Sequence, residues 1–219
     1  MILAAGRGER MKELTKKTPK PLILIKAKPL IEWHLEKLST AGFQDIVINV
    51  CYLPAIIKNF VGDGSKWKLN VTYSEENPVL ETAGGIKNAL PYLGKEAFAV
   101  INADIFSNFD YAKLRLINLN NTSDGYLVLV ENPEHNKSGD FGLSQNNYVT
   151  LNSKISHTFS GIAVYHPRFF NSLKRGVKMQ LLPLLKNAIS NSLIKGELFT
   201  GDWSDVGTPE RHALINKID

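Results

Sequence analysis

Two glycines and two arginines lie close together directly after the first apolar run of the chain, in "MILAAGRGERM" (residues 1–11). Small residues after a strand leave backbone N–H groups free to converge on an anion such as a nucleotide phosphate. The same glycines can also serve a turn alone, by supplying backbone angles that other residues avoid. Glycine spacing by itself does not separate these two interpretations, so other segments have to decide between them.

Acidic residues follow two other apolar runs. Asp104 ends "FAVINAD", and Asp205 ends "LFTGDWSD". In an open α/β sheet, ligands bind outside the carboxyl ends of the strands. Two carboxylates at such ends can meet across the crevice and hold one Mg²⁺ between phosphate oxygens. An aspartate after a strand is also a common helix cap, but the pair together with the glycine turn favours a metal site.

Alternating strand-like and helix-like runs must position these residues. The pattern predicts strands at 1–5, 45–50, 70–75 and 98–106, separated by helices at 28–42, 54–64 (ending in a turn) and 82–93. This β-α-β-α-β-α-β order predicts the α/β class with a mostly parallel sheet. Further along, the pattern predicts strands at 125–130 and 158–165, with a hairpin at 139–151 between them that turns at 145–147. It predicts helices at 111–119, at 178–191 with Pro183 internal, and at 209–218. A strand followed by a loop is predicted at 197–208.

Composition narrows the class of protein. The 219 residues suit one large globular unit, and Cys51 as the single cysteine excludes an internal disulfide and fits a reducing compartment. No run approaches the roughly 18 apolar residues of a membrane span, and the basic residues follow the first apolar run rather than precede it, unlike a signal peptide. We therefore expect a cytoplasmic protein with no membrane partner.

The net charge of +5 does not indicate nucleic acid, because the basic residues are dispersed. The densest group, "KELTKKTPK" at 12–20, lies beside the glycine turn. A duplex would call for a longer basic stripe, whereas a basic loop beside a glycine turn suits a small polyanion. His34, on the apolar face of a predicted helix, is expected to be a core residue, and no histidines have metal-ligand spacing.

Six segments resemble, in order along nearly the whole chain, the motifs of the sugar-1-phosphate nucleotidyltransferases. They are "LAAGRGERM", "TPKPL", "ETAGGI", "NAD", "TFSGI" and "WSDVGT". The resemblance implies a Rossmann-like three-layer α/β/α nucleotidyltransferase fold with a mostly parallel mixed sheet. It also implies one domain, 1–219, with a nucleotide-binding part at about 1–110 and a sugar-binding part at about 111–219. Glu9 departs from the family, since many relatives carry Thr or Ser before the arginine.

Three longer segments are most similar to the branch of the family that transfers UMP from UTP to N-acetylmuramic acid 1-phosphate in cell-wall recycling: "KPLIEWHLEKLSTAGF", "ETAGGIKNALPYLG" and "HTFSGIAVYHP". A mannose- or heptose-1-phosphate guanylyltransferase, a glucose-1-phosphate thymidylyltransferase and a non-catalytic nucleotide-sensing module remain open alternatives. An NAD- or GTP-binding protein fits poorly, because the first loop lacks full G-x-G-x-x-G spacing and no G-K-S/T follows a strand. We expect a monomer that uses Mg²⁺.

The resemblance assigns a role to each candidate residue. Arg10, Lys20 and Asp104 form the catalytic set, in which Arg10 pairs with the β- and γ-phosphates and Lys20 reaches the α-phosphate. Asp104 and Asp205 hold the metal ion. Residues expected to bind the nucleotide are Ala4, Ala5, Gly6, Arg7, Gly8, Lys20, Gly84 and Gly85, the last two beside the base. Residues expected to bind the sugar are Glu81, Asn102, Asp140 and Gly161, and the loop with His135, Asn136 and Lys137 is expected to meet a lactyl carboxylate.

Overall fold

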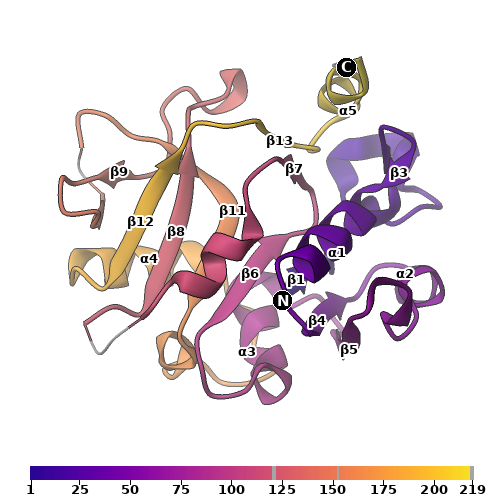
Figure 1. Ribbon diagram of the computed structural model, residues 1–219, viewed down its shortest axis with the longest axis horizontal. Coiled ribbons are helices and arrows are strands. Elements are labelled where there is room, and N and C mark those ends of the chain that lie inside the picture. Colours follow the sequence, from indigo (N-terminus) through magenta and orange to yellow (C-terminus); the bar gives the residue numbers. More distant parts are fainter. Residues whose placement is uncertain (120–121, 152, 218–219) are drawn as a thin grey trace.

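A computed structural model of the protein describes residues 1–119, 122–151 and 153–217. Within these residues the main sheet has seven strands (Figure 1). Their order across the sheet is β12 (Ile194–Phe199), β8 (Gly125–Val130), β11 (Thr158–Tyr165), β6 (Phe98–Asn102), β1 (Ile2–Leu3), β4 (Asp45–Val50) and β5 (Asn70–Glu75). The predicted α/β class with a mostly parallel mixed sheet is confirmed.

One strand runs against the others. β11 is antiparallel to both β6 and β8, whereas β1 is parallel to β4 and β6, β4 is parallel to β5, and β12 is parallel to β8. The carboxyl ends of β1, β4, β5 and β6 therefore meet along one edge of the sheet, together with the amino end of β11. This is the edge at which an open sheet binds its ligand.

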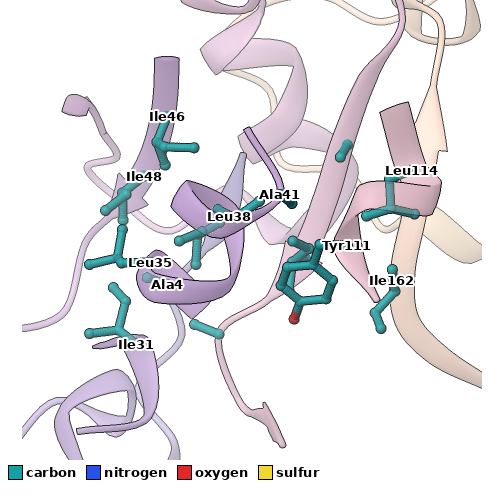
Figure 2. Close-up of a cluster of buried hydrophobic side chains, with 14 of the residues drawn as sticks. Ala4, Ile31, Leu35, Leu38, Ala41, Ile46, Ile48, Tyr111, Leu114 and Ile162 are labelled. Atoms are coloured by element: carbon teal, nitrogen blue, oxygen red, sulfur yellow. The ribbon is translucent and has the colours of Figure 1, made fainter. Parts of the chain in front are cut away.

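Helices cover both faces of the sheet. On one face α1 (Leu30–Thr40) and α2 (Pro54–Val61) share a buried apolar cluster with the strands, and Figure 2 shows Leu35 and Leu38 beside Ile46 and Ile48. On the other face α3 (Glu81–Leu93) and α4 (Leu181–Ser190) form a second cluster, and both lie behind the sheet in Figure 1. The apolar spacing of each helix dictates which side it buries, so the three-layer arrangement is as predicted.

The first predicted strand, 1–5, is reduced to Ile2–Leu3, and two predicted elements near Asp104 differ from the structure. The expected strand 98–106 breaks after Asn102 and resumes as β7 (Ile105–Ser107), which pairs antiparallel with β13 (Trp203–Asp205), part of the expected loop. The break turns the chain away from the sheet at Asp104. The apolar run continues through the break because Ile105 packs in the core, so the sequence pattern conceals it.

The remaining elements follow the predicted order. The hairpin consists of β9 (Gly142–Leu143) and β10 (Val149–Thr150), and a further ribbon joins β2 (Leu24–Ile25) to β3 (Lys28–Pro29). Residues Tyr111–Leu116 form a 3-10 helix rather than a longer helix, and Pro183 lies in the first turn of α4, where its missing N–H costs nothing. α5 spans Pro209–Lys217, and the last predicted residue of that helix, Ile218, lies outside the described residues. No helix in the described ranges is both long and apolar enough to cross a membrane.

His34 is a core residue, as predicted. It is 2% exposed, and its Nδ1 lies 2.9 Å from the hydroxyl of Tyr111, whose pKa is raised by burial. The hydroxyl keeps its proton and shares one hydrogen bond with the imidazole, whose tautomer determines which of the two groups donates. Burial lowers the pKa of His34 to about 4, with the neighbouring Lys37 charge adding to the effect.

This lowered pKa predicts a pH-dependent stability. Between pH 6.5 and 4 the unfolded chain binds a proton at His34 that the folded protein does not, so the free energy of unfolding falls as the pH falls. At pH 5 the free energy of unfolding should be roughly 2 kcal/mol lower than at pH 7 because of His34. Urea unfolding at pH 7 and pH 5 measures it, with His34→Asn as the control because the amide can still form a hydrogen bond with Tyr111 in either direction. Parallel pH profiles for the two proteins would contradict the assignment.

Candidate active site

The glycine-rich turn lines a cleft of about 540 Å³ at the carboxyl edge of the sheet. Gly8 adopts the left-handed conformation (φ 66°), and a Cβ there would lie 3.1 Å from side-chain atoms of both Lys20 and Thr15. The hydroxyl of Thr15 donates to the Gly8 carbonyl at 3.0 Å, which fixes the turn. The cleft lining includes every residue predicted for the phosphate loop: Ala4, Ala5, Gly6, Arg7, Gly8, Arg10 and Lys20.

Lys20 and Asp104 meet in this cleft. Lys20 Nζ donates to Asp104 Oδ2 at 2.5 Å, although 84 residues separate them in the chain. Lys20 is held between Pro19 and Pro21 and is only 9% exposed, so its stem is packed and its ammonium has one position. A cation and a carboxylate at one point of a phosphate-sized cleft can meet a phosphate and its counter-ion together.

Asp205 lies beside Asp104 but outside the cleft lining. The Val206 N–H donates to the Asp104 carbonyl at 2.7 Å, which joins the two backbones. Oδ2 of Asp205 pairs with Arg211 Nη2 at 3.1 Å, whereas Oδ1 is buried and accepts no hydrogen bond from any described residue, although His135 Nε2 is 3.1 Å away. Oδ1 thus faces the His135 ring without accepting a hydrogen bond, and it keeps lone pairs that a hard cation could use.

The described residues hold no cluster of three or more His, Cys, Asp or Glu side chains arranged to bind a metal ion. A cation at Asp104 and Asp205 would therefore take its other ligands from substrate phosphates and water, as magnesium in phosphoryl-transfer sites does. The chemistry of the donor set is compatible with the metal site that the sequence predicts.

Asn49 and Glu76 are two further candidate residues of the cleft that the sequence did not identify. Asn49 Oδ1 accepts from the Ala4 N–H at 2.8 Å, and its Nδ2 donates to Glu76 Oε1 at 2.7 Å. Glu76 Oε2 accepts from the Leu80 N–H at 2.7 Å. This chain of bonds, here called the Asn49 bridge, ties the glycine turn to the start of α3. A polar residue inside the apolar run "DIVINV" and an acid directly after β5 were the available signals.

A second pocket, about 350 Å³, adjoins the first. Glu81, Thr82, Asn102 and Leu3 line both, so the two form one continuous crevice. Asp140 and Gly161 line only the second, together with the apolar Phe141, Phe159 and Leu185. Gly161 (φ 80°) lets the backbone of β11 approach Asn102, because a Cβ there would lie 2.6 Å from Asn102 Nδ2. All four residues predicted for the sugar thus lie around this pocket.

A larger cavity, about 920 Å³, lies between α1 and the residues that follow β7. Its described lining includes Trp33, Lys37 and Phe109 but neither the glycine turn nor the predicted metal ligands. Size alone therefore does not identify the reactive site. The reactive site is identified instead by the convergence of loop N–H groups, cationic side chains and carboxylates in the cleft at the glycine turn.

Four residues that were predicted to contact a substrate do not line either pocket of the crevice. Gly84 and Gly85 are buried inside α3, where a Cβ would lie 2.5 Å from the Val177 carbonyl and 2.4 Å from Glu76 Oε1, respectively. Protein atoms occupy the space that was expected to hold a base. His135 and Lys137 do not line the second pocket, because the short 3-10 helix at Glu134–Asn136 directs His135 to Asp205. Asn136 does reach it indirectly, through a 3.2 Å bond to Asp140.

Comparison with known proteins agrees with this geometry. Residues 1–160 match the family model described as nucleotidyl transferase. The chain is 45% identical over 213 residues (95% of this chain, 92% of the relative) to N-acetylmuramate alpha-1-phosphate uridylyltransferase of Neisseria meningitidis. It is 28% identical to D-glycero-alpha-D-manno-heptose 1-phosphate guanylyltransferase of Campylobacter jejuni, covering 99% of this chain and 98% of that protein. The crystal structure of HddC from Yersinia pseudotuberculosis complexed with GMP-PN superposes with a TM-score of 0.78 at 25% identity, covering 99% and 96%.

The Asn49 bridge predicts a stability cost. Asn49→Ala leaves the Ala4 N–H and the buried Glu76 carboxylate without their partner, so the free energy of unfolding should fall by roughly 1–3 kcal/mol. Asn70→Ala is the matched control, because the Asn70 amide donates to an exposed Asp45 and should change stability by under about 0.5 kcal/mol. Urea denaturation measures both. Equal losses in the two variants would show that the bridge is not a stabilising connection.

Proposed function

This chain belongs to the nucleotidyl transferase family, and we propose that it transfers UMP from UTP to N-acetylmuramic acid 1-phosphate, giving UDP-N-acetylmuramic acid and pyrophosphate. The observation that carries the proposal is the continuous crevice, in which a phosphate-binding turn with Lys20 and Asp104 opens into a second pocket. The 45% identity to the Neisseria uridylyltransferase supports the choice of both substrates.

The reaction joins two polyanions. An oxygen of the sugar 1-phosphate attacks the α-phosphorus of UTP, the bond to the β-phosphate oxygen breaks, and pyrophosphate leaves. A phosphate monoester is already anionic, so no general base is required. The protein has to align the two reactants against their mutual repulsion and to neutralise charge on the transferred and departing groups.

The basic side chains divide this work. Backbone N–H groups of the glycine turn and the exposed Arg10 hold the β- and γ-phosphates, where a guanidinium binds two oxygens at once. Lys20 acts as a fixed point charge at the α-phosphate. Its partner Asp104 keeps the ammonium in place before substrate binds. Asp104 and Asp205 would together hold a divalent cation, preferably Mg²⁺, which neutralises phosphate charge when bound.

Glu76 is suited to select the base. Its carboxylate is only 5% exposed yet lines the cleft, and it can accept more hydrogen bonds than the two it receives from Asn49 and Leu80. Uracil presents an N–H at N3, whereas cytosine and adenine present an unprotonated ring nitrogen on the corresponding edge. A buried acceptor facing another acceptor is disfavoured, so this site should reject CTP and ATP.

The proposed substrates can be tested by pyrophosphate release over a grid of nucleoside triphosphates and sugar 1-phosphates, in the presence of Mg²⁺. We expect the highest kcat/KM for UTP with N-acetylmuramic acid 1-phosphate, and values roughly 10- to 100-fold lower when CTP or ATP replaces UTP. A preference for N-acetylglucosamine 1-phosphate, or for GTP or dTTP over UTP, would refute the specific assignment while leaving the family unaffected.

The carboxylate pair predicts a separate result. Asp104→Asn and Asp205→Asn should each lower kcat by at least about two orders of magnitude, because charge stabilisation at the reacting phosphate is strongest in the transition state. Asp202→Asn is the matched control, since the Asp202 carboxylate lies on the same segment but accepts from the exposed Asn108 amide. EDTA should abolish activity and excess Mg²⁺ should restore it. Full turnover in EDTA would disprove the metal requirement.

A further inference from the structure

The second pocket lacks the cation that the proposed acceptor requires. Among the described residues that line it, the charged ones are Glu81 and Asp140, both acidic. N-acetylmuramic acid differs from N-acetylglucosamine by a lactyl group that ends in a carboxylate. A third carboxylate beside two others is destabilised unless a positive charge accompanies it. If the proposed function holds, a basic side chain must therefore reach this pocket from its rim.

Lys178 is a basic side chain at that rim. Its Nζ lies 3.5 Å from Oε1 of Glu81, the residue that lines both pockets. The separation is that of a loose ion pair, and the Lys178 side chain is 63% exposed. Such a pair contributes little to stability, so the ammonium can exchange one carboxylate for another at small cost. By contrast, His135 pairs with Asp205, and Arg175 donates to the half-buried amide of Asn88.

The backbone that carries Lys178 is fixed to α3. The Met179 N–H donates to the Leu80 carbonyl at 2.9 Å, and the Gly84 N–H donates to the Met179 carbonyl at 3.0 Å. The next residue, Gln180, lines the second pocket. Gly84 has a clear reason to lack a side chain, because the Val177 carbonyl occupies that space. The segment thus presents a mobile ammonium from a rigid backbone, which is an effective way to place a binding group.

The backbone of Glu81 gives an independent indication. Glu81 has φ 60°, in the left-handed region that a residue with a side chain rarely adopts. Strained backbone of this kind persists where the surrounding structure enforces it, commonly at ligand sites. Here it coincides with the residue shared by the two pockets and paired with Lys178.

We propose that Lys178 determines sugar specificity by binding the lactyl carboxylate of the acceptor. In the free enzyme Glu81 holds the ammonium. When N-acetylmuramic acid 1-phosphate binds, Lys178 turns from Glu81 to the lactyl group, so the substrate brings the carboxylate and the protein supplies the counter-charge. N-acetylglucosamine 1-phosphate has no such group and gains nothing from Lys178.

The test compares two acceptors on each variant of the full chain, with UTP and Mg²⁺ saturating. Lys178→Met removes the charge and keeps the stem. It should lower kcat/KM for N-acetylmuramic acid 1-phosphate roughly tenfold or more, chiefly through KM, and leave kcat/KM for N-acetylglucosamine 1-phosphate within about twofold. Lys178→Arg should retain most of the preference. Lys174→Met, an exposed lysine on the same segment, is the matched control and should leave both values unchanged.

The outcomes separate this proposal from the one on which it rests. Retained turnover of N-acetylglucosamine 1-phosphate shows that the Lys178→Met protein is folded. If both acceptors lose activity equally, or if neither changes while the wild-type enzyme prefers the muramic substrate, Lys178 has no part in specificity and the proposed function stands. A wild-type enzyme that does not use N-acetylmuramic acid 1-phosphate overturns both.

Discussion

The position of every reactive group depends on the parallel pairing of β1 with both β4 and β6. β1 has only two residues, Ile2 and Leu3, yet it lies inside the sheet with a strand bonded on each side. Parallel neighbours end at the same edge, so the glycine turn after β1, Asn49 near the end of β4 and Asn102 at the end of β6 come together there. The bond from the Ala4 N–H to Asn49 then holds the turn against β4. A shift of this strand by one residue would exchange its buried and cleft-facing sides.

A crevice built on one sheet edge explains how two different anions can be bound side by side. The turn and Lys20 provide positive charge at one end, whereas the second pocket is apolar and acidic. Glu81 and Asn102 line both pockets. The reacting phosphates are therefore expected at this boundary, where Asp104 turns out of the sheet. The antiparallel β11 supports the arrangement because Gly161 brings its backbone against Asn102.

The sequence pattern was sufficient for most of the framework and for part of the site. Strands 45–50 and 70–75 were predicted residue for residue, because short strand-like runs between helical patterns, the first of them almost continuously apolar, are typical of a parallel sheet. Glycine was less informative: at Gly84 and Gly85 a missing side chain makes room for protein atoms, and sequence does not distinguish this from room for a ligand. The Asn49 bridge, the pairing of β7 with β13 and the position of His135 each depend on a partner far along the chain. The local spacing of apolar residues does not reveal which distant residue becomes such a partner.

Segments far apart in the sequence are joined on the side of the molecule that carries α5. Asn216, on the last helix, accepts from the Lys26 N–H across 190 residues, and the Val206 N–H closes on Asp104. Translation produces the glycine turn before β13 and α5, so the site cannot be completed until these later segments have been synthesised. Contacts of such high sequence separation are also slow to form because a long loop must close first. During synthesis the N-terminal half is therefore exposed at its sheet edge until β13 and α5 are available to cover it.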